Sequence, residues 1–213
     1  MQQRDIDLHK ILTAAPVVPV LTIESPDAAV PLARALVAGG LTAIEVTLRT
    51  AAALDCIRAI ASEVEDCDVG AGTVLDDVQF THAVDAGARF VVTPGASPRL
   101  VAAASDAPTP FLPGVATVGE AMTLAEQGFS TLKFFPAEAA GGVAYLKALA
   151  APLANVRFCP TGGVNAANAV DYLSLANVMC VGGSWVAPAD AVANGNWTRI
   201  TALSREAVAL RAA

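Results

Sequence analysis

Apolar residues follow two different spacings along this chain. Short runs rich in Val, Ile, Leu and Phe alternate with longer alanine-rich segments whose apolar residues recur every three or four positions. Runs of the first kind indicate buried strands, and segments of the second kind indicate amphipathic helices. We therefore predict strands at 17–21, 43–48, 68–71, 89–93, 109–112, 131–135, 156–159 and 178–181.

A helix is expected after each predicted strand. Parallel strands need helical crossovers between them, so the alternation predicts a parallel sheet. Eight such units close naturally into a (β/α)8 barrel, here an α/β TIM barrel that forms a single domain over residues 1–213 and is preceded by a short N-terminal helix. The helices are predicted at 27–38, 51–63, 77–86, 98–104, 118–127, 143–150, 166–175, 188–193 and 198–212.

An open, doubly wound sheet is the alternative architecture. Its nucleotide-binding members carry a G-x-G-x-x-G turn after the first strand. This chain has Leu21-Thr-Ile-Glu-Ser-Pro26 at that place, which favours the barrel.

Composition narrows the cellular setting. Hydrophobic residues make up 54% of the chain, yet no run of about 18 residues is free of Pro, Gly, Thr or charge, so a membrane span is not expected. The first residues mix charged and apolar side chains and lack the apolar core of a secretory signal, which predicts a cytoplasmic protein. The net charge of −7 and the absence of a Lys/Arg cluster argue against a nucleic-acid partner.

Metal chemistry is not expected either. The 4 cysteines show no C-x-x-C spacing, and most stand in apolar runs, so we interpret them as buried free thiols. The 2 histidines, His9 and His82, fall in polar helical stretches and are expected at the surface. A histidine-bound metal is therefore improbable, and the sequence predicts no cofactor.

The ends of the predicted strands are unusually polar or rich in glycine. Active sites of barrels lie at the carboxyl ends of the strands, which locates the functional face. The segments are Glu45-Val-Thr-Leu-Arg49, Gly70-Ala-Gly-Thr73, Thr93-Pro-Gly95, Pro113-Gly114, Lys133-Phe-Phe-Pro136, Pro160-Thr-Gly-Gly163 and Gly182-Gly-Ser184.

Lys133 stands inside one of these strands. Side chains alternate between the faces of a strand, so Lys133 points into the barrel when its neighbours Leu132 and Phe134 pack on the outer helices. A buried amine must be paired or uncharged. Two interpretations stay open: a salt bridge to a barrel carboxylate, or an uncharged amine that forms a Schiff base, since loss of water disfavours the ammonium form.

Glu45 and Arg49 share one predicted strand end. The apolar even-numbered residues of segment 44–48 place both side chains on the inward face. Glu45 either pairs with Arg49, or the two act separately, with Arg49 binding a substrate carboxylate through its planar fork and Glu45 moving protons. Thr73, at the end of its own strand, is expected to hold the same carboxylate through its hydroxyl.

Two glycine pairs follow the last two predicted strands. Loops after strands seven and eight form the recurrent phosphate site of barrels, where backbone N–H groups hold the anion. Gly162-Gly163 and Gly182-Gly183, with Ser184 after the second pair, stand at these two places. A cup of backbone donors also explains how a chain of charge −7 binds a phosphate without a basic cluster.

These motifs together resemble the bacterial 2-keto-3-deoxy-6-phosphogluconate (KDPG) and 4-hydroxy-2-oxoglutarate (KHG) aldolase family. The similarity covers nearly the whole chain, in order and with the expected spacing. It rests on Pro16-Val-Val-Pro-Val20, Glu45-Val-Thr-Leu-Arg-Thr50, Val69-Gly-Ala-Gly-Thr-Val74, Lys133-Phe-Phe-Pro-Ala-Glu138, Arg157-Phe-Cys-Pro-Thr-Gly-Gly163 and Gly182-Gly-Ser-Trp185.

The resemblance implies a metal-independent, homotrimeric class I aldolase of the Entner–Doudoroff pathway. Such enzymes cleave KDPG to pyruvate and glyceraldehyde 3-phosphate, and several also cleave 4-hydroxy-2-oxoglutarate to pyruvate and glyoxylate. By motif, Lys133 resembles the Schiff-base lysine and Glu45 the proton-transfer residue. Arg49 and Thr73 resemble the carboxylate binders.

The remaining roles concern the rest of a phosphorylated 2-keto acid. We expect Phe135 and Pro94 to wall the pocket, Thr161 to hydrogen-bond a substrate hydroxyl, and Ser184 to bind a phosphate oxygen. The choice between the gluconate and galactonate epimers stays open, because a single hydroxyl contact decides it.

Two other functions share part of this pattern. A sugar-phosphate isomerase or epimerase would keep the glycine loops and use Glu45 as a base, but it has no need of a lysine nucleophile. A non-catalytic barrel that binds a keto acid would keep Arg49 and the glycines, but it has no need of Lys133 together with Glu45.

Overall fold

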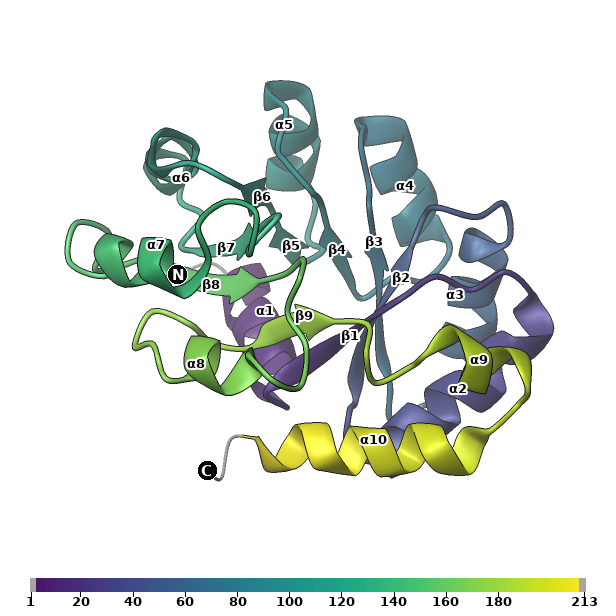
Figure 1. The fold of residues 1–213 in the computed structure, drawn as a ribbon. Helices are drawn as coiled ribbons and strands as arrows, with labels where there is room; N and C mark the ends of the chain where they lie inside the picture. Colours follow the sequence, from purple (N-terminus) through teal and green to yellow (C-terminus); the bar gives the residue numbers. More distant parts are fainter. Residues whose placement is uncertain (1–2, 211–213) are drawn as a thin grey trace.

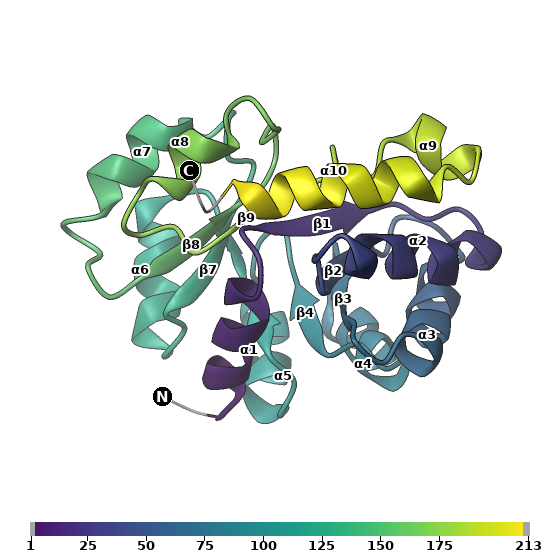
Figure 2. The same cartoon turned by 90° about the horizontal axis from the view of Figure 1, so that it is seen from below.

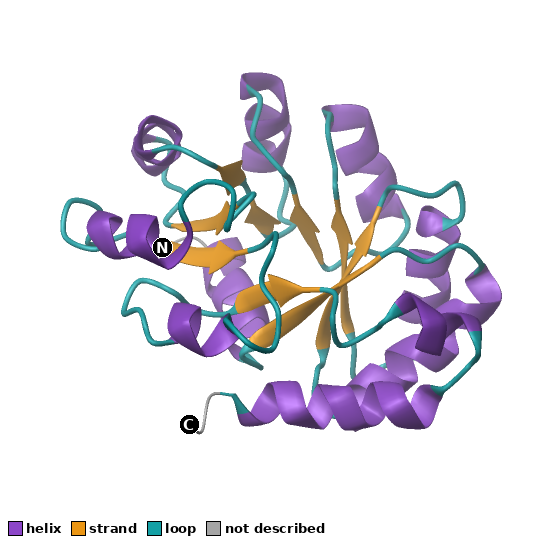
Figure 3. Ribbon diagram, in the orientation of Figure 1, coloured by secondary structure: helices purple, strands orange, loops and turns teal. Residues whose placement is uncertain are grey.

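The computed structural model describes residues 3–210, with parallel strands inside and helices outside (Figures 1 and 3). The strands are β1 (Val17–Leu21), β2 (Ala43–Thr47), β3 (Asp68–Gly72), β4 (Phe90–Val92), β5 (Phe111–Leu112), β6 (Gly114–Val115), β7 (Thr131–Phe134), β8 (Arg157–Pro160) and β9 (Val181–Gly183). The helices are α1 (Gln3–Thr13), α2 (Pro26–Ala38), α3 (Ala53–Glu63), α4 (Asp77–Asp85), α5 (Pro98–Asp106), α6 (Val118–Glu126), α7 (Gly142–Leu149), α8 (Ala169–Leu173), α9 (Ala189–Ala193) and α10 (Trp197–Ala209).

The strands close into a barrel. One sheet has the order β5-β4-β3-β2-β1-β9 and a second has the order β6-β7-β8, with every pairing parallel. Only Pro113 separates β5 from β6, and the bridges Phe158↔Val178 and Thr161↔Gly182 join the second sheet to the segment that ends in β9. With β5 and β6 counted as one strand, the predicted (β/α)8 barrel is confirmed.

Element bounds differ from the prediction in a few places. The predicted strand 109–112 begins later, as β5 at Phe111, and the barrel wall continues past Pro113 as β6, where the Thr93 hydroxyl accepts the Gly114 N–H. The predicted strand 178–181 is displaced to β9, because tertiary pairing of Gly182 with Val18 overrides the poor strand propensity of glycine. Of the predicted last helix 198–212, residues 211 and 212 lie outside the described residues.

Two apolar clusters lie on the two sides of the strands. The outer cluster packs the strands on the helices and includes Ile44, Val46, Leu132 and Phe134. The inner cluster lies in the barrel interior, where Leu8, Ile11 and Leu12 of α1 pack among strand residues such as Val18, Ala43 and Phe90. Helix α1 thus covers the end at which the strands begin (Figure 2), and the polar side chains are left to the opposite end.

Local sequence explains where the helices begin. Ser25 caps α2 by accepting the Asp27 N–H, and Asp76 caps α4 by accepting the Gln79 N–H at 2.7 Å. Thr117 and Glu120 form a capping box at α6. These caps place the helix N-termini on the side of the strand ends, as a (β/α)8 barrel requires.

The expectations for the remaining polar and sulfur-containing residues are confirmed. All 4 cysteines are free and buried, and burial raises the pKa of the Cys67 thiol to about 12. His9 and His82 are exposed.

In residues 3–210, no helix is both long and apolar enough to span a bilayer. The extent of the domain over residues 1–213 stays a prediction.

The barrel interior offers a test of this packing. A Cβ on Gly70 would lie 2.5 Å from the ring of Phe90, which is fully buried. We expect Gly70→Ala to lower the free energy of unfolding by about 1–3 kcal/mol, because the ring must leave its site. Gly119, at the start of α6, has open space around its Cα. Gly119→Ala is the matched control, with an expected gain of about 0.5 kcal/mol. Urea unfolding measures both, and equal effects would contradict the packing.

Candidate active site

Lys133 and Glu45 meet inside the barrel. The ammonium Nζ of Lys133 lies 3.2 Å from the carboxylate Oε1 of Glu45, and the two side chains are each 4% exposed. Their strands, β7 and β2, lie on opposite sides of the closed barrel, so the pair crosses its interior. The predicted inward direction of both side chains is confirmed, and the partner of Glu45 is Lys133 rather than Arg49.

The attraction between the two charges does not by itself explain why the pair is buried. At 3.2 Å the attraction is about 5 kcal/mol for an effective dielectric constant of 20. Removing the two charges from water costs several kcal/mol per ion, so the pair contributes roughly nothing to stability when compared with an apolar replacement. A buried lysine in contact with a buried carboxylate is, however, what amine chemistry with proton transfer requires.

Gly72 makes room for the Glu45 carboxylate. A Cβ at Gly72 would lie 2.0 Å from Oε1 of Glu45 and 2.4 Å from its Cγ. Sequence reasoning treated this glycine only as part of a strand end. An isolated glycine inside a strand pattern is the signal that would have found it, since it often marks a close approach of another group.

Arg49 and Thr73 lie together at the mouth of the barrel. Nε of Arg49 donates to Oγ1 of Thr73 at 3.2 Å. Strand β2 ends at Thr47, so Arg49 lies two residues beyond the strand and is exposed, whereas Glu45 is buried. Among residues 3–210, Arg49 has no carboxylate partner, so its guanidinium is available to an external anion.

Thr73 adopts an unusual backbone conformation. Its φ of 57° lies in the left-handed region, and it is the one residue other than glycine with a positive φ in the described part of the chain. A β-branched residue there costs about 1–3 kcal/mol and persists only where the surroundings enforce it. This conformation turns the chain directly after Gly72 and brings the Thr73 hydroxyl to Arg49.

Phe135 and Pro94 lie beside the lysine. The ring centroid of Phe135 is 5.4 Å from Nζ of Lys133, so the ring shields the amine from one side. Pro94 follows β4, and its backbone approaches Gly114 so closely that a Cβ on that glycine would lie 2.3 Å from the Pro94 carbonyl carbon. Gly114 in turn is the ladder partner of Lys133.

The glycine pairs surround Thr161. Thr161 is buried at the end of β8, and a Cβ on Gly182 would lie 2.3 Å from its Oγ1. Gly162 and Gly163 have φ values of 100° and 81°, which side chains other than glycine rarely adopt. The bridge between Thr161 and Gly182 brings the two pairs together, and within the described ranges the Gly163 N–H has no protein acceptor and is available to an anion.

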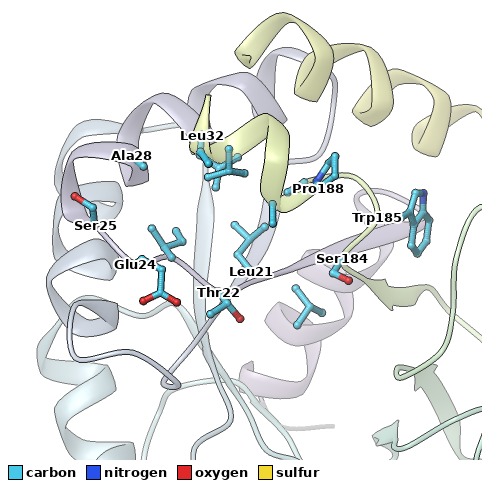
Figure 4. Close-up of a pocket in the computed structure, with 15 residues that line it drawn as sticks. Leu21, Thr22, Glu24, Ser25, Ala28, Leu32, Ser184, Trp185 and Pro188 are labelled. Carbon is cyan, nitrogen blue, oxygen red and sulfur yellow. The ribbon is translucent and has the colours of Figure 1, made fainter. Parts of the chain in front are cut away.

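Ser184 lines a cavity of about 760 Å³, a volume typical of small-molecule sites. The cavity lies at the carboxyl ends of β1 and β9, and its walls come from β1, α2 and segment 184–193 (Figure 4). The lining is largely apolar, with Thr22, Glu24 and Ser25 among its polar members. Ser184 is the predicted site residue that reaches this cavity, while Lys133 and Glu45 lie deeper in the barrel.

Known proteins match this chain in sequence. The sequence profile of the family described as KDPG and KHG aldolase matches residues 8–203. The KHG/KDPG aldolase of Escherichia coli (strain K12) is 53% identical over 200 residues, which are 94% of each chain.

Solved structures match it in fold. The KDPG aldolase of Legionella pneumophila, crystallised with pyruvate captured at low pH as a covalent carbinolamine intermediate, has a TM-score of 0.93 and 44% identity, covering 94% of this chain and 98% of that chain. The 2-keto-3-deoxy-6-phosphogluconate aldolase of Zymomonas mobilis ZM4 with 3-phosphoglycerate has a TM-score of 0.91 and 45% identity, covering 96% of both chains.

The buried pair predicts strong thermodynamic coupling. Lys133→Met and Glu45→Gln each remove one partner, and each is expected to lower the free energy of unfolding by about 3 kcal/mol, because the other group stays buried without its partner. The double variant should lose less than the sum of the two single losses. Urea unfolding of the wild type, the two single variants and the double variant, all at the same protein concentration, measures the coupling. Additive losses would show that the two groups do not interact.

Proposed function

Since this chain belongs to the KDPG and KHG aldolase family, we propose that Lys133 forms a Schiff base with the 2-keto group of its substrate. The protein is a lyase, a 2-dehydro-3-deoxy-phosphogluconate aldolase, whose products are pyruvate and glyceraldehyde 3-phosphate. The KHG/KDPG relatives extend the activity to 4-hydroxy-2-oxoglutarate, with glyoxylate as the second product. The observation that carries the roles of the residues is the buried contact between Lys133 and Glu45.

The first stage makes the imine. Glu45, 3.2 Å from the amine, accepts a proton from Lys133, and the free amine attacks C2 of the keto acid to give a carbinolamine. Glu45 then returns its proton to the departing hydroxyl, which leaves as water. The product is a protonated imine between Nζ of Lys133 and C2.

The second stage breaks the carbon–carbon bond. Glu45, again a carboxylate, takes the proton of the C4 hydroxyl, and the electron pair of the C3–C4 bond moves toward the positively charged imine nitrogen. The aldehyde leaves and an enamine remains on Lys133. Glu45 gives the proton to C3, and hydrolysis of the imine releases pyruvate and restores the lysine. The imine takes up the electrons, so these steps need no metal.

Two groups of residues orient the substrate. The exposed guanidinium of Arg49 and the hydroxyl of Thr73 bind the carboxylate next to C2, since Arg49 lacks a carboxylate of its own in residues 3–210. The available N–H of Gly163, together with Gly162, Gly182, Gly183 and Ser184, binds the phosphate.

Three further side chains shape the pocket between these anchors. Phe135 keeps water from the amine, which its ring approaches at 5.4 Å. Pro94 is expected to wall the pocket beside it, and Thr161 to hydrogen-bond a substrate hydroxyl. The cytoplasmic location and the homotrimer likewise stay proposals. The assignment as an aldolase of small keto acids does not depend on them.

The buried lysine distinguishes an aldolase from the two alternative functions, an isomerase or epimerase and a non-catalytic binding protein. An isomerase or epimerase that used Glu45 as a base would not need an amine at 3.2 Å from it. A barrel that only binds a keto acid would not need the pair either, and the pair brings no net gain in stability.

Trapping of the imine tests the role of Lys133. Borohydride reduction in the presence of pyruvate should add one pyruvate-derived group per chain, located on Lys133 by peptide mass mapping, because hydride converts the imine to a stable secondary amine. Lys133→Met should show no adduct, while Lys147→Met, at an exposed position, should be labelled like the wild type. An adduct on another lysine would remove Lys133 from this role.

Glu45→Gln separates proton transfer from imine formation. The amide cannot accept a proton, so we expect kcat for cleavage to fall by about 10²–10⁴-fold, the usual contribution of a general acid–base group. Prolonged borohydride trapping with pyruvate should still label Lys133. Steady-state kinetics and mass spectrometry measure the two effects, and an unchanged kcat would assign proton transfer to another group.

A further inference from the structure

The loops that follow β7 and β8 are joined backbone to backbone. The Ala137 N–H donates to the Thr161 carbonyl at 2.8 Å, and the Glu138 N–H donates to the Gly162 carbonyl at 3.0 Å. These bonds extend the β7–β8 ladder beyond the strand ends. The loop that begins two residues after Lys133 is therefore attached to the loop of Gly162 and Gly163.

Gly163 is held from two sides. Its carbonyl accepts from the side-chain amides of Asn165 and Asn168, each at 3.2 Å. On its other side lies Glu138, whose Cγ would be 2.5 Å from a Cβ on Gly163. The N–H of Gly163 shares its peptide plane with the Gly162 carbonyl, which accepts the Glu138 N–H, so the position of Glu138 bears on the direction of the Gly163 N–H.

Tyr172 fixes the Glu138 side chain. This tyrosine of α8 is fully buried, and its hydroxyl donates to Oε1 of Glu138. Gly142 lies against both groups, since a Cβ there would be 3.2 Å from the Tyr172 oxygen and 3.4 Å from Oε1 of Glu138. Burial, and then the carboxylate of Glu138, raise the pKa of the Tyr172 hydroxyl above its ordinary value, so it stays a proton donor at working pH.

We propose that Tyr172 and Glu138 are positioning residues for the phosphate of the substrate: their hydrogen bond holds Glu138 against Gly163 and keeps the Gly163 N–H directed at the anion. The inference rests on the proposed function, because it needs a phosphate at this loop. Donors fixed before binding cost less ordering on binding. Without the pair, the loop must be ordered by each substrate molecule, and only phosphorylated substrates bear that cost.

A comparison of phosphorylated and unphosphorylated ligands tests the proposal. For Tyr172→Phe we expect the KM for the phosphorylated substrate to rise about tenfold, the effect of losing one hydrogen bond to a charged group. The kcat should change by less than about twofold, and so should the pyruvate concentration that half-saturates borohydride trapping on Lys133, because pyruvate carries no phosphate.

Two further variants sharpen the test. Glu138→Gln keeps an acceptor oxygen for Tyr172, so its KM should stay within about threefold of the wild type. Tyr145→Phe removes another tyrosine hydroxyl, one that accepts the Val118 N–H at 3.0 Å, and should leave both measurements unchanged. If Tyr172→Phe does not fold, Glu138→Ala at the exposed end of the pair should give the same tenfold rise.

The outcomes separate the two hypotheses. A Tyr172→Phe or Glu138→Ala enzyme whose KM for the phosphorylated substrate is unchanged, or rises no more than the half-saturating pyruvate concentration, overturns the positioning role alone. A wild-type protein that forms no pyruvate adduct and does not cleave the phosphorylated substrate overturns the proposed function, and this inference with it.

Discussion

The ion pair between Lys133 and Glu45 constrains much of the surrounding structure. The two residues are separated by 88 positions in sequence and come from strands on opposite sides of the barrel, so they meet only when the barrel is closed. Apolar side chains from α1 and from the strands fill one end of the barrel interior, and the buried pair lies between them and the polar end. Gly72 must lack a Cβ for the carboxylate to occupy its place. A pair that gives little net stability thus determines the residue type at neighbouring positions.

Strand alternation was enough to predict which side chains enter the barrel. Ile44 and Val46 on one strand, and Leu132 and Phe134 on another, lie in the outer cluster, which turns Glu45 and Lys133 inward as the sequence indicates. The pairing of the two could not be predicted, because it depends on which strands face each other across a closed sheet. Glu45 had a nearer candidate in Arg49, but β2 ends at Thr47, and the arginine donates to Thr73 at the mouth of the barrel.

The strand boundaries that the sequence missed share one cause. Pro113 and the Gly182-Gly183 pair are poor strand residues, yet both belong to the barrel wall. The Thr93 hydroxyl accepts an N–H at the proline break, and pairing with β1 draws the two glycines into β9. Local propensity is overridden where the barrel brings an acceptor or a neighbouring strand to the segment. These same positions border the site, because the Pro113 carbonyl accepts the Lys133 N–H and Gly182 lies against Thr161.

The two anionic ends of the proposed substrate are held by different means, and the difference suits the order of the reaction. The carboxylate belongs to the pyruvate half, which stays covalently attached to Lys133 after the bond breaks, so its capture by the full charge of Arg49 does not delay the first product. The phosphate belongs to the aldehyde, which must leave first. In the proposed function, neutral backbone donors at Gly162 and Gly163 bind it through partial charges, which would orient the phosphate without retaining it as a cation would. The chain has a net charge of −7, and Arg49, which has no carboxylate partner in residues 3–210, supplies the positive charge at the barrel mouth for this division.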